Sequence, residues 1–303
     1  MKARTERPVK YFSIASCACL VCAVSGAAWA DDLPLTVEDL ITDKGKIKLD
    51  VSFAYANRDR QGVSTTNPVL IQTGASSFVT IPATVGESTG NSDSYVPTLG
   101  LRYGLTAKLE VYTRASMLAT SQRMEDVNGV SSSSNSHFSG LWAGINYQFK
   151  EDGATPALLG FAEMALSERR AEDTVRLKSA VLGFTTYRAI DPIVFSLTSS
   201  YRLGRSSRGD SGATFKPGGM LQINPSVAFS VNERVTLSTG VQWLRRSADV
   251  VNGQRRGYSR TETDLVLGVG YGFARGNTLN TSFRMKASGQ GGAELRMGWL
   301  YTF

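Results

Sequence analysis

The chain ends in Ala293-Glu294-Leu295-Arg296-Met297-Gly298-Trp299-Leu300-Tyr301-Thr302-Phe303, and this stretch shows the dominant period of the sequence best. Apolar and aromatic side chains recur at every second position, and most of the positions between them hold small or charged residues. A period of two is the period of a β-strand, because successive side chains of a strand point to opposite faces. In a soluble protein the apolar face would cover a core, whereas in a membrane barrel it faces lipid.

The same alternation recurs along the chain in segments of about ten residues, the length of a tilted strand that crosses a membrane. Besides the terminal strand, these segments are Ile47–Tyr55, Tyr95–Leu105, Leu109–Met117, Leu141–Phe149, Pro156–Leu166, Val175–Tyr187, Ile193–Leu203, Leu221–Val231, Val235–Arg246, Thr261–Phe273 and Leu279–Ala287. Pro156–Leu166 and Val175–Tyr187 alternate less regularly than the others. The pattern predicts an all-β fold, a transmembrane antiparallel up-and-down β-barrel of about twelve strands over residues 46–303.

A soluble β-sandwich or a lipocalin-like barrel is the alternative architecture, because its strands also alternate. Such a protein would carry dense charge on the faces that point away from its core. Here the less apolar faces are rich in Gly, Ser, Thr and Asn, with scattered charge, and aromatic residues recur near the strand ends. Aromatic side chains at strand ends are typical of the girdles of a membrane barrel, so we favour the membrane barrel.

The predicted connections alternate in length. Short turns are expected at Gly104–Lys108, Glu151–Thr155, Ala189–Pro192, Val231–Arg234 and Ala274–Asn277, and longer polar loops at Gln61–Asn91, Asp126–Ser136, Ser167–Thr174, Arg205–Pro217 and Asp249–Gly257. In outer-membrane barrels the short turns are periplasmic and the long loops extracellular. The loop Gln61–Asn91 contains apolar pieces and either protrudes as a hairpin or folds inward as a constriction. Ser131–Ser134 is expected to be a solvated loop tip.

The first 30 residues read as a cleaved secretory leader. A basic stretch, Met1–Lys10, precedes an apolar stretch, Tyr11–Val24, and Ala28-Trp29-Ala30 supplies the small residues of a cleavage site. We expect export to the outer membrane of a Gram-negative bacterium, with a lipoprotein anchored at Cys17 as the alternative. All 3 cysteines lie in this leader, so the mature chain would have no disulfide and no cysteine metal site.

A separate segment, residues 31–45, precedes the first strand. Thr36-Val37-Glu38-Asp39 has the shape of a capping box, and Val37, Leu40 and Ile41 can share one face of a short helix that ends near Gly45. The segment is either a periplasmic tail or a plug that enters the barrel. The plug candidates are Thr36, Val37, Leu40 and Ile41.

Charged residues on the inward phase of the strands would line the lumen, because a charge on the lipid face costs ~2–4 kcal/mol near the midplane. They are Lys48, Asp50, Arg102, Glu110, Arg114, Glu163, Arg202, Arg246, Glu262, Asp264, Arg284, Lys286, Glu294 and Arg296. Either they select solutes in an open pathway or they form salt bridges that close a narrow barrel. The basic excess among them favours anions in any open pathway.

Other functional classes find little support in the sequence. The net charge is +7, but no basic run interleaved with aromatics suggests nucleic acid. There is no nucleotide-binding loop, and with a single histidine we expect no metal and no cofactor. His137-Phe138-Ser139-Gly140 resembles the H-x-S-N-G motif of the outer-membrane phospholipases, although the Asn is missing. A lipid hydrolase is therefore a remote alternative to a chain without enzymatic activity.

Leu99-Gly100-Leu101-Arg102-Tyr103-Gly104-Leu105-Thr106 runs through a tight turn into Lys108-Leu109-Glu110. This stretch resembles the outer-membrane transporters of the putative meta-pathway of phenol degradation, and it is similar to the barrel part of the functional-amyloid (Fap) secretion channels. Gly45–Asp50 and the Trp299–Phe303 ending fit the same groups. The Fap channels also carry a coiled coil before the barrel, but the residues before the first strand here show no heptads.

The resemblance implies an outer-membrane channel for small aromatic or hydrophobic solutes, and the basic excess in the lumen adds anionic solutes to this expectation. Export of an amyloid-type polypeptide and a closed structural or adhesive barrel are the alternatives. The implied partners are outer-membrane lipid, the transported solutes and the barrel-assembly machinery. The machinery would read the last strand through Trp299, Tyr301 and Phe303.

Overall fold

The computed structural model describes residues 41–58, 65–66, 69–72, 78–81, 84–85, 91–126, 129–169, 176–177, 179–208, 212, 214–274, 276–288 and 292–303. The chain divides into two units, Met1–Asp32 and Leu33–Phe303, and every described residue belongs to the second. The predicted leader and the plug candidates Thr36, Val37 and Leu40 lie outside the described residues.

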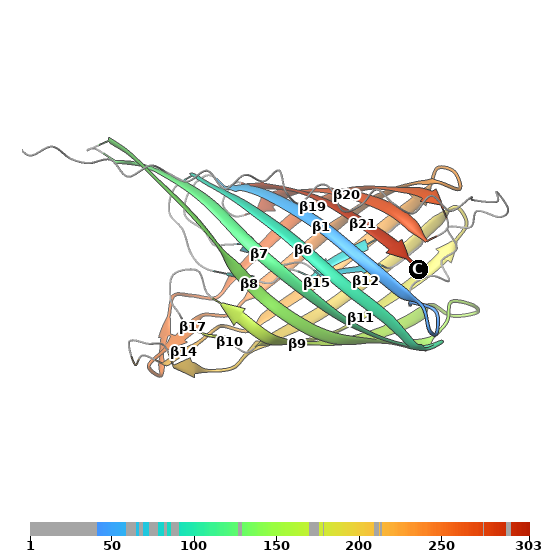
Figure 1. Ribbon diagram of the computed structural model, residues 1–303, viewed down its shortest axis with the longest axis horizontal. Helices are drawn as coiled ribbons and strands as arrows, with labels where there is room; N and C mark the ends of the chain where they lie inside the picture. Colours follow the sequence, from blue (N-terminus) through green and yellow to red (C-terminus); the bar gives the residue numbers. More distant parts are fainter. Residues whose placement is uncertain are drawn as a thin grey trace, which may run out of the picture. The chain divides into compact units, whose positions relative to one another are not determined.

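Antiparallel strands close into a barrel, which confirms the predicted fold class (Figure 1). Among the described residues the wall consists of twelve long strands: β1 (Ile47–Arg58), β6 (Asn91–Thr106), β7 (Leu109–Asp126), β8 (Gly129–Lys150), β9 (Ala157–Arg169), β11 (Ser179–Ile190), β12 (Ile193–Gly204), β15 (Met220–Ser230), β16 (Val235–Arg246), β19 (Arg260–Ala274), β20 (Asn277–Ser288) and β21 (Ala293–Thr302). Neighbours in sequence are neighbours in the wall, β21 pairs with β1, and the β8–β9 pairing completes the ring. Closure leaves no strand edge in contact with lipid, as the bilayer requires.

Short elements lie between the wall strands. β10 (Arg176–Leu177) pairs with the end of β9. The connections after β12 and β16 form a four-stranded sheet from β13 (Ser207–Arg208), β14 (Thr214–Lys216), β17 (Asp249–Val251) and β18 (Gln254–Arg256). Within residues 61–91, β2 (Thr65–Thr66) pairs with β5 (Thr84–Val85), and β3 (Val69–Gln72) pairs with β4 (Phe78–Ile81). These pairings do not decide between the two predictions for that loop.

The outward face of the barrel is apolar. Leu99, Leu101 and Tyr103 of β6 are each more than 40% exposed, while Gly100 and Arg102 between them are buried on the inside. The same alternation places large apolar side chains outside on every wall strand. A soluble protein rarely exposes so large an apolar surface, so this belt faces lipid and the barrel is of the outer-membrane kind.

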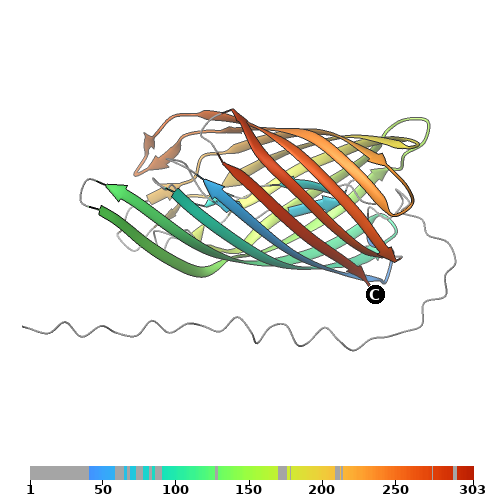
Figure 2. The same ribbon diagram turned by 90° about the horizontal axis from the view of Figure 1, so that it is seen from above.

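The C-terminus lies at the rim of short turns (Figure 2), and aromatic pairs occur near the strand ends at this rim. Edge-to-face pairs form between Tyr147 and Phe149, with 4.9 Å between ring centroids, and between Tyr301 and Phe303, with 4.7 Å. Aromatic rings at the strand ends suit the interface between lipid and water. Because short turns are periplasmic in outer-membrane barrels, we assign this rim to the periplasmic side.

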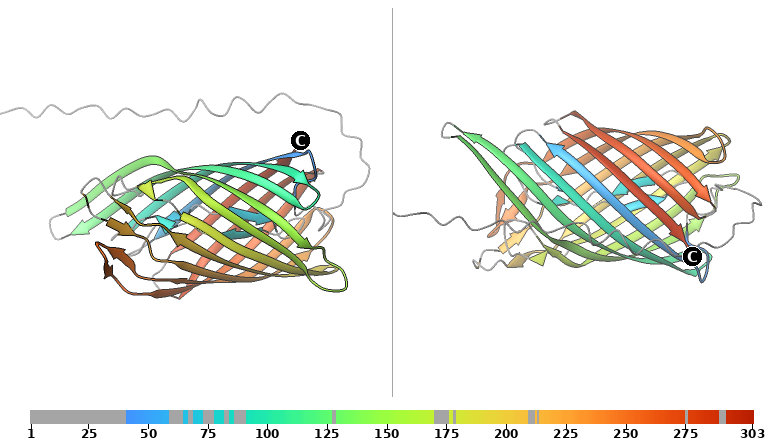
Figure 3. Two further views of the ribbon diagram at one scale, coloured as in Figure 1. Left: turned by 90° about the horizontal axis from the view of Figure 1, so that it is seen from below. Right: turned by 45° about the horizontal axis from the view of Figure 1, so that its top comes forward.

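One predicted loop is wrong. Asp126–Ser136 was expected to be a long polar loop, but β7 and β8 stay paired as far as Asp126 and Gly129. Ser131–Ser134 is therefore strand rather than a loop tip, and this hairpin extends beyond the neighbouring strands (Figure 3). Serine is polar but adopts strand geometry without strain, so composition alone gave the wrong boundary.

The helix predicted for residues 31–45 lies mostly outside the described residues. Its last part, Ile41–Gly45, is not helical, and Gly45 has a φ of 81° at a turn into β1. In the part of the chain that is described, no helix is long and apolar enough to cross a membrane.

Candidate functional site

The lumen is the candidate site, and its lining follows from the strand phase. Every charged residue predicted to line it lies on the inward face of its strand, and none of these residues is exposed. The most buried are Glu110 (1%), Glu163 (3%) and Arg296 (3%). Most of these charges lie in three groups, and every carboxylate among them except that of Asp264 accepts a hydrogen bond from a basic or amide side chain of another strand.

The first group lies at the periplasmic mouth and is centred on Glu110 of β7. Its Oε1 accepts a hydrogen bond from Asn146 Nδ2 of β8 at 2.8 Å and lies 3.7 Å from Arg102 Nη1 of β6. Arg102 in turn binds Asp50 Oδ2 of β1 at 3.1 Å. The other carboxylate oxygen, Oε2, is directed to the segment that precedes β1.

That segment passes inside the barrel mouth. The backbone N–H of Thr42 donates to Glu110 Oε2 at 2.8 Å, and the Thr42 hydroxyl donates to the same oxygen at 2.5 Å. Thr42 is fully buried and Ile41 is 5% exposed. Ile41 packs with Ala157, Leu159 and Tyr187, residues on the inward faces of β9 and β11. The described part of the segment therefore contacts several strands across the mouth.

Gly104 of β6 provides the space for this crossing. The Gly45 N–H donates to the Gly104 carbonyl at 2.8 Å, and the Gly104 N–H donates to the Lys46 carbonyl at 3.2 Å. A Cβ at Gly104 would lie 2.1 Å from the Asp43 carbonyl oxygen and 2.3 Å from that of Thr42. Only glycine permits this approach of two backbones.

The second group surrounds Trp142 of β8. Arg114 of β7 forms a bidentate pair with Glu163 of β9, at 2.6 and 3.0 Å. Arg202 of β12 binds Glu168 and the Ser179 hydroxyl. The guanidinium carbons of Arg114 and Arg202 lie 5.0 and 5.6 Å from the Trp142 ring centroid, within cation–π range.

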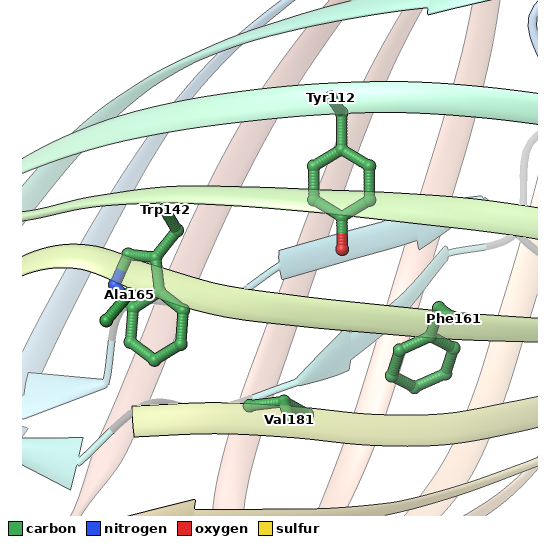
Figure 4. Packing of buried hydrophobic residues seen from close by; sticks show 5 residues of the cluster. All are labelled: Tyr112, Trp142, Phe161, Ala165 and Val181. Atoms are coloured by element: carbon green, nitrogen blue, oxygen red, sulfur yellow. The ribbon is translucent and has the colours of Figure 1, made fainter. Parts of the chain in front are cut away.

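An apolar cluster adjoins this group on the inner wall. Tyr112, Trp142, Phe161, Ala165 and Val181 form it from four neighbouring strands, β7 to β11 (Figure 4). Gly144 makes room for the Tyr112 ring, since a Cβ there would lie 2.5 Å from Tyr112 Cζ. One sector of the lumen wall is thus aromatic.

The third group lies on the strands opposite in the barrel order, β19 to β21. Arg284 and Arg296 both bind Glu294, and Arg284 Nε lies 3.9 Å from Asp264 Oδ2. Lys286 Nζ binds Glu262 Oε2 at 2.6 Å. Arg246 forms a separate bidentate pair with Asp249, at 3.0 and 2.9 Å, and Lys48 is buried on β1.

Comparison with known proteins supports the fold. No family model and no curated protein matches the chain. The chain is similar to one solved structure, the COG4313 outer membrane channel from Pseudomonas putida F1, with a TM-score of 0.64. The two sequences are 13% identical, and the match covers 91% of this chain and 100% of that one. The translocator domain of the autotransporter NalP from Neisseria meningitidis gives a TM-score of 0.50 and 14% identity over 88% and 92%. At these identities the likeness concerns the barrel fold alone.

Sequence reasoning missed Glu168, the partner of Arg202. Inward residues of β9 have odd numbers up to Ala165, so Glu168 has the wrong phase. The β8–β9 register shifts between Leu141 and Trp142, and this bulge turns Glu168 inward. With Glu168 the predicted set of eight basic and six acidic residues becomes eight and seven, which weakens the argument for anion preference.

Thr42, Asn146 and Trp142 were also missed, for a different reason. In the sequence, charge is what marks a residue of the lumen, and these three side chains are neutral. Gly104 stands out in the sequence only as part of a turn motif. A glycine on the inward face beside a turn, such as Gly104, can indicate that another backbone approaches closely.

The proposed hydrolase pair lies on β8, where Ser139 is 1% exposed and His137 is half-buried. Among the described residues no group of three His, Cys, Asp or Glu side chains is placed to hold a metal ion.

Proposed function

We propose that this chain is an outer-membrane channel for small solutes whose periplasmic mouth is closed by residues 31–44. The observation that carries the proposal is the hydrogen bonding of Thr42 to Glu110 inside the barrel. Burying the Glu110 carboxylate costs free energy unless the carboxylate is well hydrogen-bonded. The N-terminal segment supplies two of its hydrogen bonds, which a tail without a function in the lumen would not need to do. The plug candidates Thr36, Val37, Leu40 and Ile41 belong to this segment.

The division of the lumen wall supports a class of solute. An aromatic sector around Phe161 faces a charged sector around Arg284 in the strand order of the barrel. A small aromatic or hydrophobic solute with an anionic group would find favourable contacts on both sides. In this proposal the ion-paired residues of the lumen set which solutes pass, and the chain carries out no chemical reaction.

Deletion of residues 31–44 is expected to open the channel. Refolded residues 31–303 should show little conductance in a planar bilayer, and refolded residues 45–303 should show steady channels at least ten-fold larger. A reversal potential in a salt gradient then reports the ion preference. Equal conductance of the two forms would refute the plug but keep the channel. Silence of both would refute the channel and favour a closed structural barrel.

We also propose that the last strand is the signal for the barrel-assembly machinery. Trp299 and Tyr301 lie on β21, and Phe303 is 67% exposed at its end, in edge-to-face contact with Tyr301. Removing Phe303 should lower the folded protein in cell membranes several-fold, because the machinery loses its recognition residue. Refolding of the same variant into detergent should be unchanged. An equal loss in both assays would mean that Phe303 acts through stability.

A further inference from the structure

The two connections that form the small extracellular sheet place cationic side chains on one of its faces. Arg208 of β13 is opposite Thr214 of β14, Lys216 of β14 is opposite Val250 of β17, and Val250 is opposite Arg255 of β18. Paired residues of adjacent strands share a face, and so do residues two apart on one strand. Arg208, Lys216 and Arg255 therefore lie on the same face, and all three are exposed.

The opposite face of the small sheet is directed to the lumen side. It carries Phe215, Val251 and Asp249, none of which is exposed, and at its outer strand the exposed Gln254 and Arg256. Asp249 accepts both hydrogen bonds from Arg246 and one from the Gly218 N–H at 2.7 Å. Since Arg246 is on the inward face of β16, the cationic face points away from the lumen.

No described acidic residue forms an ion pair with the cations of this face. Arg208 donates only to the Gly212 carbonyl, at 3.2 Å. Lys216 and Arg255 are two strands apart, roughly 10 Å, and Arg205 and Arg245 are further exposed cations at the adjoining strand ends. Like charges gathered in this way repel each other, and an anionic ligand would relieve that repulsion.

The periplasmic rim provides the contrast. Basic and acidic side chains are mixed there, and Lys108 pairs with Glu151 at 3.3 Å and Arg188 with Asp152 at 3.4 Å. Two exposed periplasmic cations that form no ion pair with a described residue, Lys150 and Arg234, lie at different turns. On the extracellular side, by contrast, several such cations gather in one place, above β12 to β19: Arg205, Arg208, Lys216, Arg245 and Arg255.

We propose that Arg208, Lys216 and Arg255, with Arg245 beside them, bind the phosphate groups of an anionic glycolipid of the outer leaflet. Arg245 lies on the same outward face of β16 as Val241, which is 41% exposed in the lipid-facing belt. The cationic surface therefore begins where the apolar belt ends, at the level of lipid headgroups. A headgroup with several phosphates can bind several of these cations at once, which raises its affinity. A small solute on its way to the lumen has fewer anionic groups and binds fewer cations.

The test is the affinity of the detergent-solubilised mature protein for bis-phosphorylated lipid A and for its dephosphorylated form. Arg208→Gln, Lys216→Gln and Arg255→Gln together should weaken binding of the phosphorylated form at least ten-fold and leave the dephosphorylated form unchanged. The matched control removes three exposed cations of the periplasmic rim, Lys108→Gln, Lys150→Gln and Arg234→Gln. It should change the affinity less than two-fold. Binding by the wild type should fall with added salt.

Two results would overturn the proposal. The first is an equal loss in both triple variants, which would mean that binding follows net charge alone. The second is full competition by inorganic pyrophosphate together with an altered reversal potential, which would identify the surface as a capture site for soluble anions. Heat-dependent gel mobility checks that each variant is folded. If the triple variant does not fold, Lys216→Gln and Arg255→Gln separately should each weaken binding about three-fold. The affinity measurement does not depend on whether residues 31–44 plug the channel, and the reversal potential is measured with residues 45–303.

Discussion

A thiol placed at Ile41 should be almost unreactive in the refolded mature chain and become reactive when Gly104→Ala is added. The Ile41 side chain is 5% exposed, and a Cβ at Gly104 would lie 2.1 Å from the Asp43 carbonyl oxygen. The backbone at Thr42 and Asp43 must therefore move, and the hydrogen bonds to Glu110 are lost. A hydrogen bond to a charged group contributes about 1.5–3 kcal/mol, so maleimide labelling of Ile41→Cys should accelerate roughly 10- to 100-fold.

The matched control is Gly100→Ala on the same inward face of β6. There the three nearest atoms to an added Cβ are the Asp50 Cβ at 3.2 Å and the carbonyl oxygens of Asp50 and Thr113 at 3.7 Å, and none of them belongs to the N-terminal segment. Labelling of Ile41→Cys should then stay slow. The native cysteines lie at positions 17, 19 and 22, so refolded residues 31–303 contain no competing thiol. Slow labelling in Gly104→Ala would show that the segment does not depend on this contact, and the plug proposal would lose its support.

The wall of the barrel could be predicted from the sequence because every second residue of a strand faces lipid and is therefore apolar. Thr261–Phe273 was expected as a strand and β19 spans Arg260–Ala274, and Leu279–Ala287 corresponds to β20, Asn277–Ser288. Each lipid-facing position must be apolar, so phase and number of strands follow from alternation alone. The inward face obeys no such rule, and this is where the prediction became uncertain.

Pro156–Leu166 illustrates the difference. It alternates poorly because its inward residues Leu159, Phe161 and Ala165 are apolar as well as its outward ones. Two of them belong to the aromatic cluster, and Leu159 contacts Ile41 of the N-terminal segment. The irregular pattern was therefore a sign of internal packing. Periodicity predicts which face of the strand a side chain lies on. Its contacts depend on the register of strands that are distant in the sequence.

Glu163→Gln is expected to lower the free energy of unfolding by about 3–5 kcal/mol, the cost of leaving a buried charge without its partner. Arg114 and Glu163 are 6% and 1% exposed at the side chain and joined by a bidentate pair. The substitution keeps the volume of the side chain, so no cavity contributes. Urea unfolding of the protein refolded in lipid vesicles measures the change. In the control Glu151→Gln, the partner Lys108 is 49% exposed, and the loss should stay below about 1 kcal/mol.

A third variant distinguishes the net contribution of the Arg114–Glu163 ion pair to the free energy of unfolding from the cost of leaving one of its charges unpaired. Arg114→Leu with Glu163→Leu removes both charges together, and apolar replacement of a buried pair is often close to neutral. We expect this double variant to be more stable than Glu163→Gln, because Trp142 and Phe161 offer apolar neighbours in the same cluster. If the single and double variants are both as stable as the control, water reaches Arg114. The lumen beside Trp142 would then be wet enough to serve as part of the solute path.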